Sequence, residues 1–141
     1  RDITNNYGKI FLNSSTLRNN SADNGGSIHN HHGGKIEISN SIFKNNAAKS
    51  DGGAIENRGN ELIMQKGTLN KNKAEQDGGA IYNFNSENVI IKNSILTENT
   101  AKREGGAIWN YSENNELKIV DCIFKENYPD NINQSHNNAQ K

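Results

Sequence analysis

Cysteine, proline, tryptophan and methionine each occur once in the 141 residues, and aromatic residues make up 6% of the chain. The single cysteine, Cys122, excludes an intrachain disulfide framework. Hydrophobic residues make up 31% and the mean hydropathy is −0.94, too little for a large conventional core. No apolar run is long enough to cross a membrane, so we expect no direct insertion by this segment. The formal net charge is zero, without a basic stripe, which argues against nucleic acid as a partner.

What the chain has instead is repetition. A Gly-Gly pair followed by Ala or Ser, Ile, any residue and Asn returns at intervals of 27, 26 and 27 residues. The pairs are Gly25-Gly26, Gly52-Gly53, Gly78-Gly79 and Gly105-Gly106. Self-similarity of this period is typical of stacked repeats, in which each coil buries its inward residues against the next coil. A thin core therefore suffices, despite the low hydrophobic content.

A second motif, Phe or Leu followed by any two residues and then Asn, runs in register with the first. Its apolar positions are Leu17, Phe43, Leu69, Leu96 and Phe124. A short alternating segment such as Ile36-Glu37-Ile38 precedes each copy, and alternation over so few residues predicts a strand. Three short strands joined by turns fit a coil of 26–27 residues. The sequence thus predicts an all-β, single-stranded parallel β-helix of about five coils.

Each recurrent residue has a structural role in this fold. The Gly-Gly pair permits a tight corner before the strand that carries the Ile column. Two columns of asparagine are expected to stack as side-chain amide ladders at turns. The first consists of Asn30, Asn57, Asn83 and Asn110, and the second of Asn20, Asn46, Asn72, Asn99 and Asn127.

The pattern divides the chain into a repeat domain at residues 1–127 and a polar cap or disordered tail at residues 128–141. Ile3-Thr4-Asn5 fits the end of a block whose glycines are missing, so we expect either a capped half-coil or a fragment of a longer array with neighbouring repeats in the same chain. A secretion signal is then expected upstream. The tail is rich in asparagine and has no repeat pattern.

The paired motifs resemble the polymorphic outer-membrane protein repeat of chlamydial surface adhesins. Gly-Gly-Ala-Ile at residues 52–55, 78–81 and 105–108 matches that repeat, and Gly25-Gly26-Ser27-Ile28 departs from it by one residue. Phe43 and Phe124 match the aromatic position of the other motif, which leucine occupies elsewhere. The resemblance covers residues 3–127. It implies a right-handed parallel β-helix with a pectin lyase-like fold, an extracellular location at a cell surface and adhesion as the usual role. It supplies no catalytic residue.

The candidate binding residues are aromatic. Two flank Asn83 and two flank Asn110, and alternation along a strand sends all four outward in one patch: Tyr82, Phe84, Trp109 and Tyr111. The equivalent positions of earlier coils hold Glu56 and Arg58, then His29 and His31. Exposed aromatic clusters mark surfaces that bind sugars or proteins. The alternatives are a cross-strand stack that stabilises the sheet and a surface covered by a neighbouring domain.

Three further patterns have a structural interpretation that we prefer. His29-Asn30-His31-His32 resembles a metal tract but lacks a carboxylate or Cys partner, so a solvated turn is expected. Cys122 shares a column of small residues and is expected to point inward. Asp51, Asp77 and Glu104 precede their glycine pairs and form an acidic column. That column is expected to cap turns, with Ca²⁺ binding and acid–base catalysis as alternatives.

The sequence therefore predicts a non-catalytic, adhesin-like surface module that needs no cofactor. It would bind a cell-surface glycan or protein, or act as a stalk. The alternative is a carbohydrate-active β-helix enzyme, a polysaccharide lyase or glycosidase. Such an enzyme would show isolated Asp, Lys or Arg residues that break the columns on one sheet.

Overall fold

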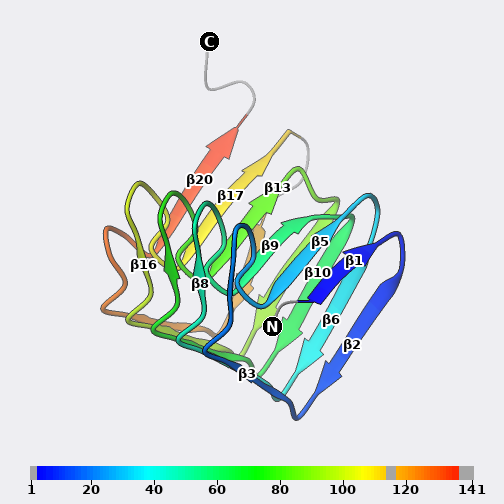
Figure 1. The fold of residues 1–141 in the computed structure, drawn as a ribbon, viewed down its shortest axis with the longest axis horizontal. Helices are drawn as coiled ribbons and strands as arrows, with labels where there is room; N and C mark the ends of the chain where they lie inside the picture. Colours follow the sequence, from blue (N-terminus) through cyan, green and yellow to red (C-terminus); the bar gives the residue numbers. More distant parts are fainter. Residues whose placement is uncertain (1–2, 114–116, 137–141) are drawn as a thin grey trace.

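The computed structural model describes residues 3–113 and 117–136, which form an all-β solenoid of about five coils (Figure 1). No α-helix occurs in these two ranges, and hence no helix that could span a membrane. Every strand pairs in parallel with the equivalent strand of the next coil, so the sheets run along the solenoid axis. The predicted parallel β-helix is confirmed.

Four sheets, here named A to D, make up the wall. Sheet A contains β1 (Ile3–Asn6), β5 (Ile28–His31), β9 (Ile55–Arg58), β13 (Ile81–Phe84), β17 (Ile108–Ser112) and β20 (Ile132–His136). Sheet B contains β2 (Lys9–Asn13), β6 (Lys35–Ser39), β10 (Glu61–Gln65), β14 (Asn88–Lys92) and β18 (Leu117–Val120). Sheet C contains β3 (Thr16–Arg18), β7 (Ile42–Lys44), β11 (Thr68–Asn70), β15 (Ile95–Thr97) and β19 (Ile123–Lys125). Sheet D contains β4 (Ser21–Ala22), β8 (Ala47–Ala48), β12 (Lys73–Ala74) and β16 (Thr100–Ala101).

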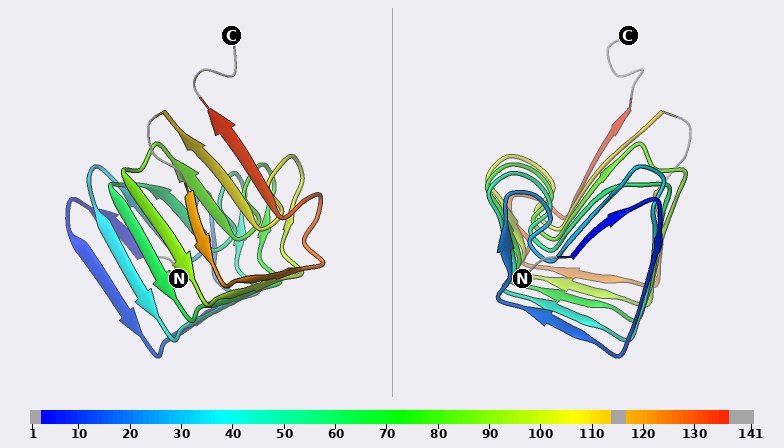
Figure 2. Two further views of the ribbon diagram at one scale, coloured as in Figure 1. Left: turned by 180° about the vertical axis from the view of Figure 1, so that it is seen from behind. Right: turned by 45° about the vertical axis from the view of Figure 1, so that its right-hand side comes forward.

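Sheet D corrects the prediction of three strands per coil. Its strands have two residues each and carry the alanine that follows the second motif, such as Ala74 in β12. Two residues are too few to show alternation, so the hydrophobic pattern could not distinguish this strand from a turn. The connections from sheet D to sheet A hold the Gly-Gly pairs and form a row of superposed loops along one side of the solenoid (Figure 2).

The core is a set of columns in coil-to-coil register. Ile28 pairs with Ile55, Ile55 with Ile81, and Ile81 with Ile108, and all four are fully buried. Phe43, Leu69 and Leu96 form a second buried column, and the inward residues of sheet B, such as Leu62 and Met64, complete the core. Each coil thus buries its apolar side chains against the coils above and below, as predicted from the repeat.

The two glycines of each pair serve different purposes. The first adopts a left-handed conformation, with φ of 71° at Gly52 and Gly78, which glycine enters without steric cost. The second lies against neighbouring backbone: a Cβ on Gly79 would overlap the carbonyl oxygen of Gly106 in the next coil. Gly-Gly is therefore required for both a turn and a close approach between coils.

Residues 128–136 continue the stack without a glycine pair. β20 pairs with β17, and Ile132 extends the Ile column beyond Ile108. Asp130 replaces the missing backbone partners, because its Oδ1 accepts the N–H groups of Gly105 and Gly106 at 2.8 and 3.0 Å. Residues 132–136, which fall within the predicted polar cap or disordered tail at 128–141, thus form a strand. Residues 137–141 lie outside the described residues.

Candidate binding surface on sheet A

The outward side chains of sheet A form two columns along the solenoid axis, because alternate residues of each strand point away from the core. One column runs through His29, Glu56, Tyr82 and Trp109, and the other through His31, Arg58, Phe84 and Tyr111. We call these eight residues the outer strip. The four strands that carry it, β5, β9, β13 and β17, lie side by side in Figure 1. The strip changes chemistry from coil to coil, from imidazole to an ion pair to aromatic rings.

The structure brings the four predicted aromatic residues together as two stacked pairs. The rings of Tyr82 and Trp109 are 4.6 Å apart at 5°, and those of Phe84 and Tyr111 are 5.1 Å apart at 14°. Their exposure differs, however. Phe84 is 37% exposed and Tyr82 only 7%. The expectation that all four are exposed is therefore wrong for Tyr82, whose ring lies between neighbours. The stacking also matches the alternative role, stabilisation of the sheet.

Arg58 covers the aromatic pairs on the side of the preceding coil. Its guanidinium carbon lies 5.1 Å from the ring centre of Tyr82 and 5.0 Å from that of Phe84, within the range of cation–π attraction. Glu56 holds it there, because Arg58 Nε donates to Glu56 Oε2 at 2.6 Å. Sequence reasoning noted Glu56 and Arg58 only as column equivalents. Their opposite charges two residues apart on a strand were the available signal.

Glu56 is a buried carboxylate between two basic side chains, those of His29 and Arg58. It is 1% exposed, and its Oε1 lies 2.6 Å from His29 Nε2. Burial raises the pKa of Glu56, but the contacts with His29 and Arg58 outweigh burial and leave that pKa lowered. Burial alone would lower the pKa of Arg58, but the hydrogen bond to Glu56 outweighs burial, and the pKa of Arg58 is raised. Both groups therefore stay charged at neutral pH.

The histidines continue the strip toward the first coil. The rings of His29 and His31 stack at 4.5 Å, and His31 lies 4.2 Å from His32. Burial, followed by repulsion from His29 and His32, lowers the pKa of His31. The predicted solvated turn is correct for exposed His32 but wrong for His29 and His31, which lie in β5. Within the described ranges, no three His, Cys, Asp or Glu side chains are placed to hold a metal ion.

The acidic column links the turns of successive coils. Asp51 and Asp77 are both 9% exposed. Asp51 Oδ1 accepts the backbone N–H of Asp77, and Asp77 Oδ1 accepts that of Glu104, each at 3.1 Å. Burial raises the pKa of both aspartates. These contacts support the turn-capping interpretation, in which each carboxylate joins one coil to the next.

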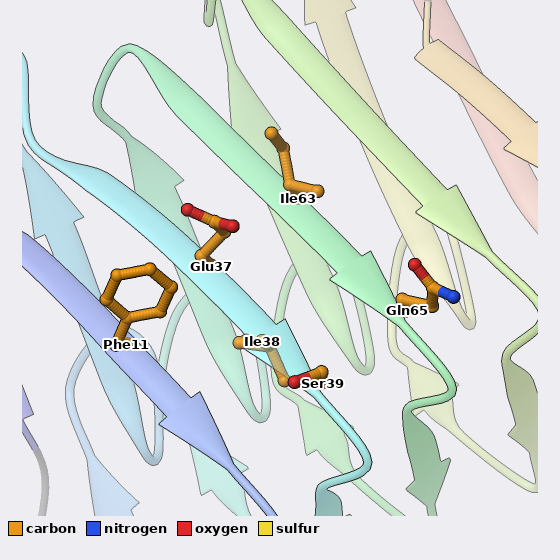
Figure 3. A pocket seen from close by; sticks show the side chains of 6 residues that line it. All are labelled: Phe11, Glu37, Ile38, Ser39, Ile63 and Gln65. Atoms are coloured by element: carbon orange, nitrogen blue, oxygen red, sulfur yellow. The ribbon is translucent and has the colours of Figure 1, made fainter.

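A different surface feature was missed by sequence reasoning. A hollow of about 260 Å³ lies on the outer face of sheet B, between Phe11 and Ile63 (Figure 3). Glu37 borders it and pairs with Lys9 at 2.9 Å, while the Lys9 ammonium lies 4.5 Å from the Phe11 ring centre. Phe11 is 69% exposed. An aromatic residue at an outward position of an alternating segment was the signal for this feature.

Comparison with known proteins agrees with the repeat pattern. Residues 40–58, 66–83 and 93–111 each match the family model of the Chlamydia polymorphic membrane protein repeat. Searches of curated proteins and of solved structures gave no significant match. Each matched segment contains the Asn of the second motif and a Gly-Gly-Ala-Ile block. The chain therefore carries the polymorphic membrane protein repeat, as its motifs predicted, and this repeat indicates a module of a surface-exposed outer-membrane protein.

Within the repeat, the motif residues and the outer strip are different positions. The glycines, isoleucines and asparagines of the motif are buried in the scaffold. Glu56, Tyr82 and Trp109 occupy the position between Ile and Asn, where the motif accepts any residue. The repeat thus holds the residues of the outer strip in place, but its motif does not determine which residues they are.

Proposed function

We propose that the chain is a non-catalytic, adhesin-like module of an extracellular surface protein, and that the outer strip of sheet A binds a cell-surface glycan or protein. The observation that supports this proposal is the change of the strip from coil to coil, with Arg58 and the Phe84 ring exposed beside stacked aromatic residues. A purely structural face would be free to repeat the same residue, as the asparagine columns do. Neighbouring repeats of the same protein would extend the stack on either side.

The matched experiment compares aromatic residues on two faces. Phe84 and Tyr111 are replaced together by Ala, and Phe11, which is exposed on sheet B, is replaced by Ala as the control. Binding of each purified variant to cultured epithelial cells is measured by flow cytometry, and folding is checked by circular dichroism. We expect the double variant to keep its spectrum and lose at least tenfold in binding, while Phe11→Ala binds normally. Equal binding by all three proteins would contradict the proposal.

A stalk is the simpler alternative within the same class. In that case the aromatic stack serves only to stabilise sheet A. The unmodified protein would then bind neither cells nor any member of a glycan array, while the double variant would be measurably less stable.

One observation favours the enzyme alternative: Glu56 and Arg58 interrupt the columns of sheet A with a carboxylate and a base. Against it, Glu56 is 1% exposed with both oxygens in contact with bases, and Asp51 and Asp77 are each bound to a backbone N–H. Incubation with pectins, followed by assays for reducing ends and unsaturated products, tests it directly. New products that disappear in Glu56→Gln would establish the enzyme.

A further inference from the structure

Arg58 is the one arginine of the outer strip, and it is fixed in place while part of its guanidinium remains accessible. Its Nε–H is taken by Glu56, and Nη2 lies 3.4 Å from the hydroxyl of Tyr82. The side chain is 39% exposed, and no acceptor for Nη1 is found among the described residues. Arginine has five N–H donors in a planar fork, and its terminal pair matches the two oxygens of a carboxylate.

Phe84 extends this site with apolar surface. Its ring centre is 5.0 Å from the guanidinium carbon, and it is the one large apolar side chain of sheet A that is more than a third exposed in the described residues. A group that accepts hydrogen bonds from Arg58 would therefore rest its remaining atoms against a single ring. Ring edges carry positive charge, which also favours oxygen-rich ligands.

We infer that the outer strip binds a carboxylate-bearing sugar, with the carboxylate on the terminal nitrogens of Arg58 and the sugar ring beside Phe84. This inference rests on the proposed function and names the ligand class of the same surface.

The size of the site favours a sugar over an acidic peptide. A stable protein interface covers about 1,200–2,000 Å² and is anchored by several buried aromatic or apolar side chains. The other large exposed apolar residues lie off sheet A: Phe11 and Val120 on sheet B, Ile42, Ile95 and Ile123 on sheet C, and Tyr7 and Tyr128 in connections between strands. One exposed ring beside one charged fork is the scale of a monosaccharide.

Two carboxylates near Arg58 affect the orientation of its guanidinium and its attraction for an anion. Glu56 and Asp51 both interact electrostatically with the guanidinium. Glu56 is committed through Oε2 to Arg58 Nε, and Asp51 through Oδ1 to the backbone of Asp77. Glu56 therefore orients the fork toward the exposed side, and both carboxylates reduce its net attraction for an anion. We accordingly expect modest affinity per site, with geometry rather than net charge selecting the ligand.

The test uses trigalacturonic acid and its fully methyl-esterified form, which differ in the charge of the carboxyl groups, together with 3′-sialyllactose and lactose as a second matched pair. Binding to the 141-residue protein is measured by isothermal titration calorimetry. We expect at least one acidic sugar to bind, and its neutral partner to bind at least tenfold more weakly. Arg58→Gln and Arg58→Lys should each weaken the acidic sugar by about 10- to 100-fold, because lysine keeps the charge but not the fork. Lys44→Gln, an exposed change on sheet C, should leave it unchanged.

The following results would contradict the inference. No binding of either acidic sugar, equal binding of the neutral partners, or an unchanged Arg58→Gln variant would overturn it. Tighter binding of a pentaglutamate peptide would assign the site to a protein ligand instead. If the Arg58 variants do not fold, the Nε–H resonance of Arg58 in the unmodified protein must shift on addition of the acidic sugar, and its failure to shift would overturn the inference. Cell binding that persists in the absence of sugar binding would leave the proposed function intact.

Discussion

The corner between sheets C and D and the outer face of sheet A follow opposite rules. At the corner, Asn46, Asn72 and Asn99 make the same contacts in successive coils. Asn72 Oδ1 accepts the backbone N–H and an Nδ2–H of Asn46, while Asn72 Nδ2 donates to Asn99 Oδ1 and to the carbonyl of Phe43. On the outer face, each coil carries different residues. A position that bonds to its own copies in adjacent coils must repeat, whereas a position that faces outward is free to change. The scaffold and the candidate site are therefore distinguishable within one repeat.

The first asparagine column, at the corner between sheets A and B, lies between these extremes. Asn5, Asn30, Asn57 and Asn83 are linked by amide hydrogen bonds, from Nδ2 of each to Oδ1 of the next. Asn83 Nδ2, however, is buried without a hydrogen-bond partner among the described residues. The ladder is broken at the corner where the number of residues between sheets A and B varies from coil to coil.

The largest effect is expected where coils touch backbone to backbone. Gly79→Ala places a methyl group onto the carbonyl oxygens of Gly106 and Thr100, which the parallel register holds in place. We expect a loss of at least about 4 kcal/mol in the free energy of unfolding, or failure to fold. Gly33→Ala is the control, because that glycine has φ of 82° but open space around it, and should cost about 1 kcal/mol. Urea denaturation of both variants checks this, and equal midpoints would contradict the assigned packing.

The next largest effect is expected from a central ladder rung. Asn72→Ala removes the acceptor for two donors of Asn46 and the donor for the carbonyl of Phe43, all in the interior. We expect a loss of about 3 kcal/mol, because each buried group left unpaired costs about 1–3 kcal/mol. Asn70→Ala, an outward change two residues earlier, should cost less than about 1 kcal/mol. A ladder without structural importance would give the two variants similar midpoints.

A smaller, pH-dependent effect is expected at Glu56. Glu56→Gln removes the charge that holds Arg58 and His29, and we expect a loss of about 1–2 kcal/mol at pH 7, since both partners are partly exposed. The pKa of Glu56 is lowered in the folded state, so its contribution is present above the ordinary glutamate pKa of about 4.3 and is lost as the pH falls through the folded value. Unfolding curves from pH 2 to pH 7 should therefore converge in acid. A constant difference would contradict the ion pair.

The smallest effect, of opposite sign, is expected at Asp51. Its pKa is raised by burial, so the ionised form is the less favourable one in the folded protein. Stability from this group is present below the ordinary aspartate pKa of about 3.9 and is lost as the pH rises through the folded value. Asp51→Asn keeps an acceptor for the Asp77 N–H, and asparagine already occupies this column at Asn24. We expect up to about 1 kcal/mol of stabilisation at pH 7 that vanishes near pH 3. A destabilised variant at pH 7 would show that the charge itself is needed.

The fold was largely predictable because its determinants are periodic. The spacing of the glycine pairs and of the columns through Ile28 and Phe43 specified parallel coils in register. The fourth strand, at Ala74 and its equivalents, was not predictable from alternation because it spans two residues. β20 was also missed, since Asp130 replaces the glycine pair with a side-chain acceptor, a substitution that no spacing rule reveals.

The candidate site was predictable in position and incompletely in content. Register placed Trp109 over Tyr82 and Tyr111 over Phe84, which the structure confirms. The same register could not show that Arg58 spans both rings or that Glu56 is buried, because these contacts depend on side-chain conformation and on the loops beside sheet A. Burial of Tyr82 follows from those neighbours and not from its position on the strand.

The most direct test of the division between scaffold and site is a substitution scan of every described outward position on sheets A, B and C. Each variant is displayed on yeast and scored twice, for folding with a conformation-specific antibody and for adhesion to cultured epithelial cells. We expect variants that fold but fail to adhere to cluster at Arg58, Phe84 and Tyr111. Adhesion that is insensitive to every sheet A position, or lost mainly on sheet C, would contradict the assignment of the outer strip as the binding surface.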